Sequence, residues 1–371
     1  MMHQQRGYIL FITFSILALC TAIVSVFMIK GLTHKKFTQL LLNQEQMQQF
    51  TLSTTALAQS FLSFPAPDKK EKNSDESLTP KDKTPEVPAD QGFAKKLLEK
   101  VLPVVNKTQT FMMKEMEKDF PVVINLTFSC ESGKININGL YDLVGKKFYD
   151  EGVEGKDKKV FATWLFDKIA TLTEKPSLLQ PFIEHVKQRK TPLNDVTQLL
   201  AIKEFSQCFA DAIFNDPAQE KQSTDKKIGK LFLTDIFTVA SENDTIQPWL
   251  LSESVCALLD IVKQGSKQQE SEKKEDLKVD VSSFKQQADW QKDWDVSLKP
   301  IYGIAYDKIP EPVRMMFANQ FSAEVFSIMA TVKRQVVDVE YDKAIRMYAI
   351  LKQKKLPDNS ITYDVIKIYQ V

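Results

Sequence analysis

The hydrophobic pattern of this 371-residue chain begins with one long apolar segment. A short, polar and basic leader, residues 1–7, precedes an uncharged apolar stretch over residues 8–29, and the stretch is followed by Lys30, His34, Lys35 and Lys36. At about 1.5 Å per residue, a helix over this stretch is about 33 Å long, enough to cross a bilayer core of about 30 Å. The pattern therefore predicts a transmembrane helix that tethers everything after it.

Apolar residues continue beyond the predicted membrane span, with no Pro or Gly between residues 32 and 64. One interpretation is a single helix over residues 8–64, whose outer part is a stalk that packs against partner helices. The other is a membrane span followed by a separate amphipathic helix, and the pattern leaves both open. Leu41 and Phe50 are the stalk residues that we expect to contact a partner.

Residues 65–92 are predicted to be a disordered linker. Five prolines alternate there with Lys, Asp, Glu and Ser, and no aromatic residue is present, so the segment buries too little apolar surface to fold. A helix is then predicted over residues 93–118, with a possible bend at Pro103. A run of branched and aromatic residues over 122–128 predicts a strand.

Helical periodicity dominates the middle of the chain, and we assign residues 156–230 to an inserted helical domain. Apolar residues recur there at steps of three and four: Phe161, Trp164, Leu165, Ile169 and Leu172. Thr191 and Pro192 are predicted to be the N-cap and first position of a further helix. Residues 248–263 predict another helix, and residues 264–300 are interpreted as a polar insert.

Alternation of apolar and polar residues predicts antiparallel strands near the end of the chain. The alternating runs cover residues 326–332, 344–351 and 361–369. With residues 93–155 as the first part of the same domain and residues 231–371 as its second part, the fold class is α+β. A long N-terminal transmembrane helix is joined to an antiparallel sheet, with a helical domain inserted between strands.

Composition narrows the class of function. The chain is 43% hydrophobic and 26% charged with a formal net charge of +1, so it lacks the basic excess typical of nucleic-acid binding. No Cys-x-x-Cys pair indicates a metal or redox site. The three cysteines after the membrane span, Cys130, Cys208 and Cys256, are interpreted either as buried free thiols or as holding one disulfide.

No residue pattern predicts a catalytic or metal site. His185 is interpreted as a surface histidine, and Gly133-Lys134 lacks the other residues of a phosphate-binding loop. An acidic cluster of Asp150, Glu151, Glu154 and Asp157 does not have the spacing of an EF-hand. We interpret it as an exposed loop, and we expect no enzyme activity and no cofactor.

One motif carries a resemblance to a known family. The segment at residues 130–140 reads Cys-Glu-Ser-Gly-Lys-Ile-Asn-Ile-Asn-Gly-Leu, and it resembles a segment of protein K, the large minor pseudopilin of type II secretion. Within it we expect Glu131, Gly133 and Lys134 to form a turn in which Gly133 needs special backbone angles. Asn136 and Asn138 are expected to bond the backbone of this turn. Residues 191–200, residues 233–239 as a return strand, and the terminal strands extend the resemblance over most of the chain.

The leader fits the same family. Arg6-Gly7 directly before an apolar helix resembles the prepilin-type leader, which prepilin peptidase cuts after the Gly, so the mature chain would begin at Tyr8. Most pilins have Glu at the fifth residue after the cut. Ile12 occupies that position here, and protein K is the pseudopilin that typically lacks the Glu.

The resemblance implies a pilin-like fold and a mechanical rather than enzymatic role in protein export. It implies a single-pass protein of the inner membrane with a periplasmic domain, which caps the pseudopilus tip together with other minor pseudopilins. Calcium is possible by this resemblance, but the family's acidic stretch is replaced by Asp-Lys-Ile-Ala at residues 167–170. The alternatives are a minor pilin of a type IV pilus, an unprocessed periplasmic scaffold, and a membrane-anchored periplasmic hydrolase.

Overall fold

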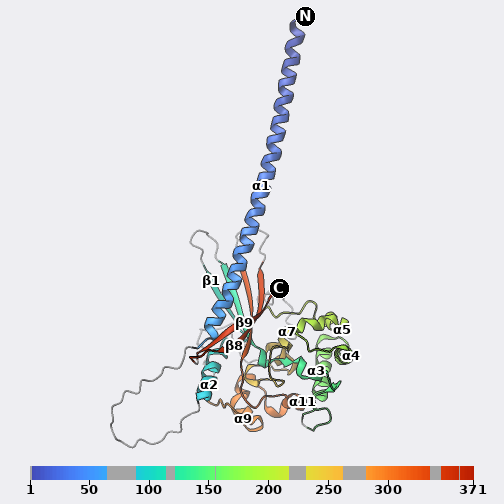
Figure 1. The fold of residues 1–371 in the computed structure, drawn as a ribbon, viewed down its shortest axis with the longest axis vertical. Helices are drawn as coiled ribbons and strands as arrows, with labels where there is room; N and C mark the ends of the chain where they lie inside the picture. The colour runs from blue at the N-terminus through green and yellow to red at the C-terminus, as the bar shows by residue number, and fades with distance from the viewer. Residues whose placement is uncertain are drawn as a thin grey trace, which may run out of the picture. The chain divides into compact units, whose positions relative to one another are not determined.

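A computed structural model describes most of the chain as a mixture of helix and antiparallel sheet (Figure 1). The described residues are 2–64, 89–113, 122–154, 156–216, 231–261, 281–334, 344–358 and 360–371. For residues 2–13 only the backbone is described. The chain divides into two compact units, Met1–Leu52 and Ser53–Val371, which are described separately.

Helix α1 runs without a break over 61 residues, Met2–Leu62. This decides between the two interpretations of the N-terminal region in favour of a continuous helix. The helix contains no Pro, and the side chains of Thr21, Ser25 and Thr33 donate hydrogen bonds to carbonyls one turn earlier. The residues of the predicted leader are helical from Met2 onward.

A five-stranded antiparallel sheet forms the centre of the second unit, in the order β1-β2-β7-β8-β9. Its strands are β1 (Thr108–Met113), β2 (Val122–Cys130), β7 (Val325–Arg334), β8 (Ile345–Lys355) and β9 (Ile361–Gln370). The strand predicted at residues 122–128 and the three predicted near the C-terminus are confirmed. Strands β2 and β7 are neighbours, so the helical region between them is inserted into the sheet, as expected.

Strand β1 contradicts the helix predicted over residues 93–118. The helix there, α2, is shorter and spans Ala89–Val101. Pro103 follows it and cannot donate a helical hydrogen bond. The chain then returns as β1, where Thr108 pairs with Thr127 of β2 and the two hydroxyls lie 3.2 Å apart. Residues 114–118, the end of the predicted helix, lie outside the described residues, as do residues 65–88 of the predicted linker.

The inserted region contains short helices and is coloured from green through yellow to orange in Figure 1. Its first helices are α3 (Lys158–Thr173), α4 (Leu179–Gln188), the 3-10 helix η3 (Val196–Ala201) and α5 (Lys203–Phe209). The prediction that Thr191 and Pro192 start a helix is wrong. Helix η3 begins instead at Val196, because Asp195 is its N-cap and accepts a hydrogen bond of 2.8 Å from the Thr197 amide.

The return strand predicted over residues 233–239 is mostly helical. Residues Leu233–Ile236 form one turn, α7, and only Phe237–Thr238 are extended, as β6. Strand β6 pairs in parallel with β3 (Ile135–Asn136). A second small sheet joins β4 (Tyr141–Asp142) to β5 (Lys147–Phe148).

The helix predicted over residues 248–263 is two shorter helices, η4 (Pro248–Leu250) and α8 (Glu253–Leu258). Ser252 separates them because its hydroxyl caps α8 by accepting from the Val255 amide at 3.2 Å. Of the predicted polar insert at residues 264–300, the described part begins at residue 281. It contains α9 (Trp290–Ser297) and the start of α10 (Lys299–Tyr302), and Trp290 and Trp294 are buried. Helices η6 (Tyr306–Lys308) and α11 (Glu311–Arg314) follow.

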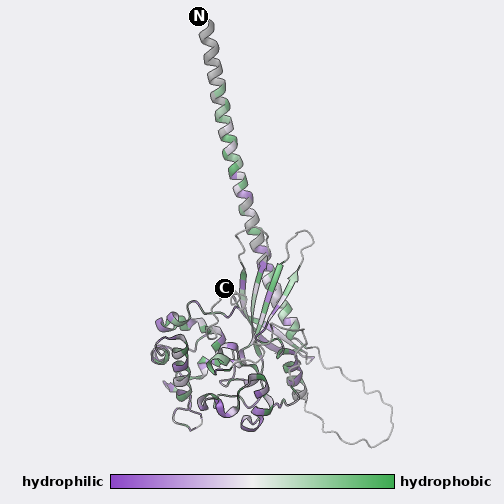
Figure 2. Cartoon of the chain, turned by 180° about the vertical axis from the view of Figure 1, so that it is seen from behind, coloured by the Kyte–Doolittle hydropathy of each residue, from purple (hydrophilic) through white to green (hydrophobic). Residues whose placement is uncertain are grey.

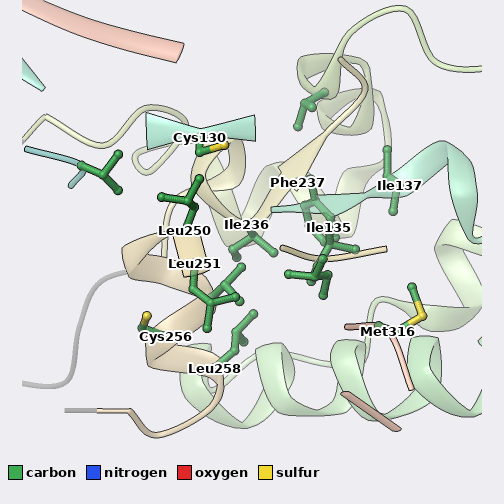
Figure 3. Packing of buried hydrophobic residues seen from close by; sticks show 14 of the residues in the cluster. Cys130, Ile135, Ile137, Ile236, Phe237, Leu250, Leu251, Cys256, Leu258 and Met316 are labelled. Atoms are coloured by element: carbon green, nitrogen blue, oxygen red, sulfur yellow. The ribbon is translucent and has the colours of Figure 1, made fainter. Parts of the chain in front are cut away.

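One hydrophobic core connects the sheet, the end of α1, α2 and the inserted helices. Ala58 and Leu62 of α1 are fully buried in it, and the ring of Phe61 lies 5.3 Å from that of Phe128 on β2. Figure 3 shows a part of this core in which Ile135 lies beside Phe237. Leu250 and Leu251 lie below Cys130 in the same view. The core thus extends from the sheet directly into the helical region.

Candidate functional site

The first candidate site is the outward surface of α1. Large apolar side chains are exposed along it, and Figure 2 shows the corresponding green bands: Phe14, Leu17, Leu19, Ile23, Val24, Val26, Phe27, Met28, Ile29, Leu32, Phe37, Leu41, Leu42 and Leu52. The stretch Leu17–Lys35 is long and apolar enough to cross a membrane by length and composition. The hydroxyls within it are already satisfied by helix carbonyls, so they add little to the penalty of placing the helix in lipid.

The predicted processing and assembly residues all lie on this helix. Gly7, Tyr8 and Ile12 are helical, and their side chains are outside the described set. Leu41 is 50% exposed, while Phe50 is half-buried. The apolar side chains of α1 beyond the membrane span therefore fall into two groups. Some of those up to Leu57 are exposed, whereas Phe61 packs on the core of the globular unit.

The second candidate site is the motif at residues 130–140, which lies where the helical region leaves β2. Glu131 and Lys134 are 2% and 1% exposed and form a buried ion pair. The Lys134 ammonium also lies 2.9 Å from the Ser327 hydroxyl of β7 and 3.2 Å from the Tyr348 hydroxyl of β8. The other Glu131 oxygen accepts a hydrogen bond of 2.5 Å from Thr238 of β6. The pair thus ties the motif to three strands.

Burial governs the protonation of this network. Burial alone would lower the pKa of Lys134, but the charge of Glu131, with Tyr348 and Asp235 beyond it, holds that pKa above its ordinary value. Burial also raises the pKa of Tyr348, with Glu131 adding to the effect. Burial raises the pKa of the neighbouring Cys130 thiol to about 12. Lys134 is therefore charged, while Tyr348 and Cys130 stay protonated, and none of the three is prepared to act as a base or nucleophile near neutral pH.

Gly133 has a different role from the one predicted. Its φ does not lie in the left-handed region, where Gly152 and Gly303 are found, so the expectation of special backbone angles is wrong. It is instead packed against the chain at η4. A β-carbon at Gly133 would lie 1.7 Å from the carbonyl oxygen of Leu250, which no side chain could tolerate. A Gly is needed here for close approach of two backbones.

The two asparagines of the motif hold other loops as well as their own turn. The Asn136 side chain accepts from the Asn138 amide at 3.2 Å, as expected. Its amide group also donates to the carbonyls of Ser241 at 2.9 Å and Asn243 at 3.2 Å. Asn138 exchanges two hydrogen bonds, of 2.8 and 2.9 Å, with the backbone of Leu193. Ile135 and Ile137 of the same motif are buried.

The acidic cluster at residues 150–157 has structural partners. Asp157 caps α3, accepts a hydrogen bond of 2.8 Å from the Gly152 amide, and has a lowered pKa mainly because of that bond. Glu151 pairs with Lys159 at 2.7 Å. In the part of the chain that the structure describes, no group of three or more His, Cys, Asp or Glu is arranged to hold a metal ion.

The remaining candidate residues differ in part from expectation. His185 is half-buried rather than on the surface, and burial lowers its pKa. All four cysteines are free, and Cys130 and Cys256 are buried. Sequence reasoning missed Thr238, Ser327 and Tyr348 as partners of the motif. Ser327 and Tyr348 lie on strands that the alternation did predict, but nothing in the pattern signals which strand residues meet Lys134.

Comparison with solved structures gives a weak structural likeness. No protein-family profile matches the chain, and no curated protein matches it significantly. A chain in the crystal structure of the GspK–GspI–GspJ complex, from the type 2 secretion system of enterotoxigenic Escherichia coli, aligns with 76% of this chain and 94% of its own length. The aligned residues are 9% identical and the TM-score is 0.35.

Proposed function

We propose that this chain is a minor pseudopilin of the protein K type, which caps the tip of a type II secretion pseudopilus and takes part in protein export. The observation that carries the proposal is α1: one unbroken helix of 61 residues with exposed apolar side chains, joined to a globular unit built on an antiparallel sheet. The motif at residues 130–140 and the Arg6-Gly7 leader support the same family.

The length of α1 supports assembly with other helices. At about 1.5 Å per residue the helix is about 90 Å long, whereas a bilayer core needs only about 30 Å. Exposed Phe37, Leu41 and Leu42 lie beyond the candidate span Leu17–Lys35. Apolar surface left in water is unfavourable by about 25 cal/mol per Å². Parallel helices of other minor pseudopilins would cover this surface.

Membrane placement follows from the same helix. The span anchors the chain in the inner membrane, and the globular unit lies in the periplasm. Prepilin peptidase cuts after Gly7, so that Tyr8 becomes the first residue. A carboxylate at position 12 would be costly in lipid unless it were paired. Ile12 avoids that cost, which suits a subunit with no further subunit above it.

In this proposal the motif residues have a structural role. Glu131, Lys134 and Gly133 fix where the helical region leaves the sheet, while Asn136 and Asn138 hold neighbouring loops. The helical region is thereby held rigidly on the sheet at the exposed end of a fibre. No cofactor or catalytic residue enters the mechanism.

The mature N-terminus tests the proposal directly. In cells that contain prepilin peptidase, intact-mass measurement of the membrane-extracted protein should give a chain that begins at Tyr8. Gly7→Leu should block this cleavage, because the peptidase needs the Gly before the cut. Gly31→Leu is the matched control, because Gly31 lies on the same helix with open space around it. A chain that still begins at Met1, or one that begins near residue 31, would favour an unprocessed or signal-cleaved scaffold and refute the pseudopilin.

A further inference from the structure

Five cations gather where the turn of the β4–β5 hairpin meets the end of α4. Four are exposed and the arginine is half-buried: Lys146, Lys147, Lys187, Arg189 and Lys190. The Lys146 ammonium joins the two elements, because it donates to the carbonyls of Lys187 at 2.7 Å and of Arg189 at 3.2 Å. Carbonyls at the end of a helix attract cations, so this contact fixes the turn against α4.

The charge of this cluster is not neutralised within the described part of the chain. None of the ion pairs among the described residues includes any of the five cations. The Arg189 guanidinium donates to neutral oxygen atoms. The carboxylate of Asp142, on β4, accepts a hydrogen bond of 2.9 Å from the Val144 amide, and that of Glu184, one turn earlier on α4, accepts one of 3.0 Å from Gln180. Positive charge is therefore in excess here.

Two exposed apolar side chains border the same cations. Val144, at the tip of the hairpin, is 94% exposed, and Tyr149, just after β5, is 41% exposed. Both line one surface hollow together with Arg189 and Lys190, so they belong to the same surface. We call the five cations with Val144 and Tyr149 the basic tip. Apolar surface is unfavourable in water, and an exposed apolar group beside charges indicates an interaction site.

The shape of the basic tip favours a bilayer over a folded protein as its partner. Val144 projects almost fully from the surface, whereas the side chains that anchor protein interfaces lie in well-packed pockets. A bilayer with anionic lipids offers both chemistries at once, since its phosphates attract cations and an apolar layer lies directly below them. The bilayer needs no preformed pocket to receive the valine.

We propose that the basic tip docks on the surface of a bilayer that contains anionic phospholipids. The four lysines and Arg189 contact headgroup phosphates, while Val144 and Tyr149 enter the boundary between the headgroups and the acyl chains. The inference goes beyond the proposed function and does not depend on it, because every contact is made by the globular unit and none by α1.

Sedimentation with vesicles tests this on the full chain, which is held through α1 in nanodiscs of neutral phosphatidylcholine. Sucrose-loaded vesicles with one third phosphatidylglycerol should carry the protein into the pellet, whereas vesicles of phosphatidylcholine alone should not. Because the attraction is between exposed charges, raising the salt concentration should weaken it steeply. Free glycerol 3-phosphate offers one phosphate without a bilayer and should not compete.

A pair of lysine variants tests the cations. Lys147→Gln with Lys190→Gln should weaken binding about 25-fold, since each cation near an anionic bilayer contributes about fivefold. Lys107→Gln with Lys355→Gln is the matched control, because it removes the same charge from exposed lysines elsewhere on the globular unit. This control should bind as the natural chain does. The changed side chains are exposed, so the melting temperatures should not change.

The apolar contact is tested separately. Val144→Ser should weaken binding to the anionic vesicles at least about threefold through lost apolar burial. Val296→Ser changes another exposed valine, on α9, and should have no effect. Poly-L-glutamate is the probe for an acidic protein segment. At an equal concentration of negative charge it should bind more weakly than the anionic vesicles, because it offers Val144 no apolar layer.

Several outcomes would overturn the proposal. Equal binding to neutral and anionic vesicles, or no binding to either, would show that the basic tip does not recognise anionic lipid. Equal losses in the lysine variant and its control would show an effect of net charge alone. Competition by glycerol 3-phosphate would indicate a site for free phosphate. Unchanged binding by Val144→Ser, or tighter binding of poly-L-glutamate, would identify a site for an acidic protein instead.

Discussion

Lys134 shows how a charged residue can serve structure alone. Its ammonium is buried, and it forms one network with oxygen atoms of four residues, Glu131, Ser327, Tyr348 and Thr238. A buried pair of this kind contributes little net stability compared with apolar residues of equal size. We infer that its effect is specificity, because the motif must lie against strands β6, β7 and β8 for these groups to pair.

Removing only one charge of the Glu131–Lys134 pair should lower the free energy of unfolding far more than removing both. Lys134→Met leaves Glu131 buried and unpaired, and we expect the free energy of unfolding to fall by about 3–5 kcal/mol. The double variant Glu131→Gln with Lys134→Met should be less destabilised than the sum of the two single variants. Chemical denaturation of the four proteins measures this. The control is Lys354→Met, whose exposed pair with Asp364 should contribute under about 1 kcal/mol. Additive effects would contradict a coupled network.

Gly133→Ala should destabilise the protein by at least about 2 kcal/mol, because the new methyl group would overlap the Leu250 backbone. Gly92→Ala on α2 is the matched control. It has open space, and we expect a small gain of at most about 1 kcal/mol from helix propensity. Thermal unfolding of both variants compares them. An unchanged melting temperature for Gly133→Ala would contradict the close approach described here.

The sequence predicted that Gly133 matters but gave the wrong reason. A Gly in a Glu-Ser-Gly-Lys turn suggests special backbone angles, because a short motif gives information only about neighbouring residues in the sequence. The group that requires the Gly is the Leu250 carbonyl, which lies far along the chain and approaches only when the core forms. The same holds for Lys134, whose partners Ser327 and Tyr348 come from strands near the C-terminus.

At the scale of elements, periodicity predicted the helices and strands whose structure is determined by their own local sequence. The alternation of residue types predicted β7, β8 and β9, and an apolar run without Pro predicted α1. Burial alternates only in β9, because residues 325–332 of β7 and 347–351 of β8 are buried on both faces of the sheet. Strand β1 was missed because Phe111, Met112 and Met113 are all exposed and do not alternate. It is a strand because β2 offers it a partner edge. Tertiary pairing decided its structure, and the sequence of β1 alone carried no such signal.

The outer part of α1 should be an assembly surface. Leu41→Asp with Phe50→Asp places two charges where we expect apolar contact, which should reduce recovery of co-purified minor pseudopilins by more than about tenfold. The globular unit should keep its melting temperature. Val160→Asp is the control, because Val160 is an exposed apolar residue on α3. If partners are retained, or if the globular unit unfolds, the stripe is internal packing and the assembly surface is refuted.

At the scale of the whole molecule, the chain joins an apolar helix to a large globular unit that includes an inserted helical region. The α+β class and the insertion between strands followed from the order of the periodic segments. The packing of that region could not be predicted, because it depends on ion pairs between residues far apart in the sequence. Asp195 pairs with Lys367 of β9 at 2.8 Å, and Asp216 pairs with Arg346 of β8 at 2.7 Å.

A subunit that caps a fibre should not extend one. Because Ile12 provides no carboxylate, the chain expressed alone should form no filaments. Produced in excess beside a major pseudopilin, it should shorten the filaments that the major subunit forms, since each added cap ends growth. Electron microscopy of sheared filaments measures both effects. Ile12→Glu is the informative variant, because it should relieve the shortening. Long filaments composed of this chain alone would contradict capping.

The position of the insertion also affects how the chain folds during its synthesis. Strand β2 ends at Cys130 and its neighbour β7 begins at Val325, which is 195 residues later. At about 5–20 residues per second, synthesis of that interval takes about 10–40 s. Pairing between segments so distant in sequence is also intrinsically slow. The β1–β2 hairpin must therefore wait, with its apolar residues uncovered, until the last strands arrive. The newborn chain is most vulnerable to proteases and to aggregation during this interval.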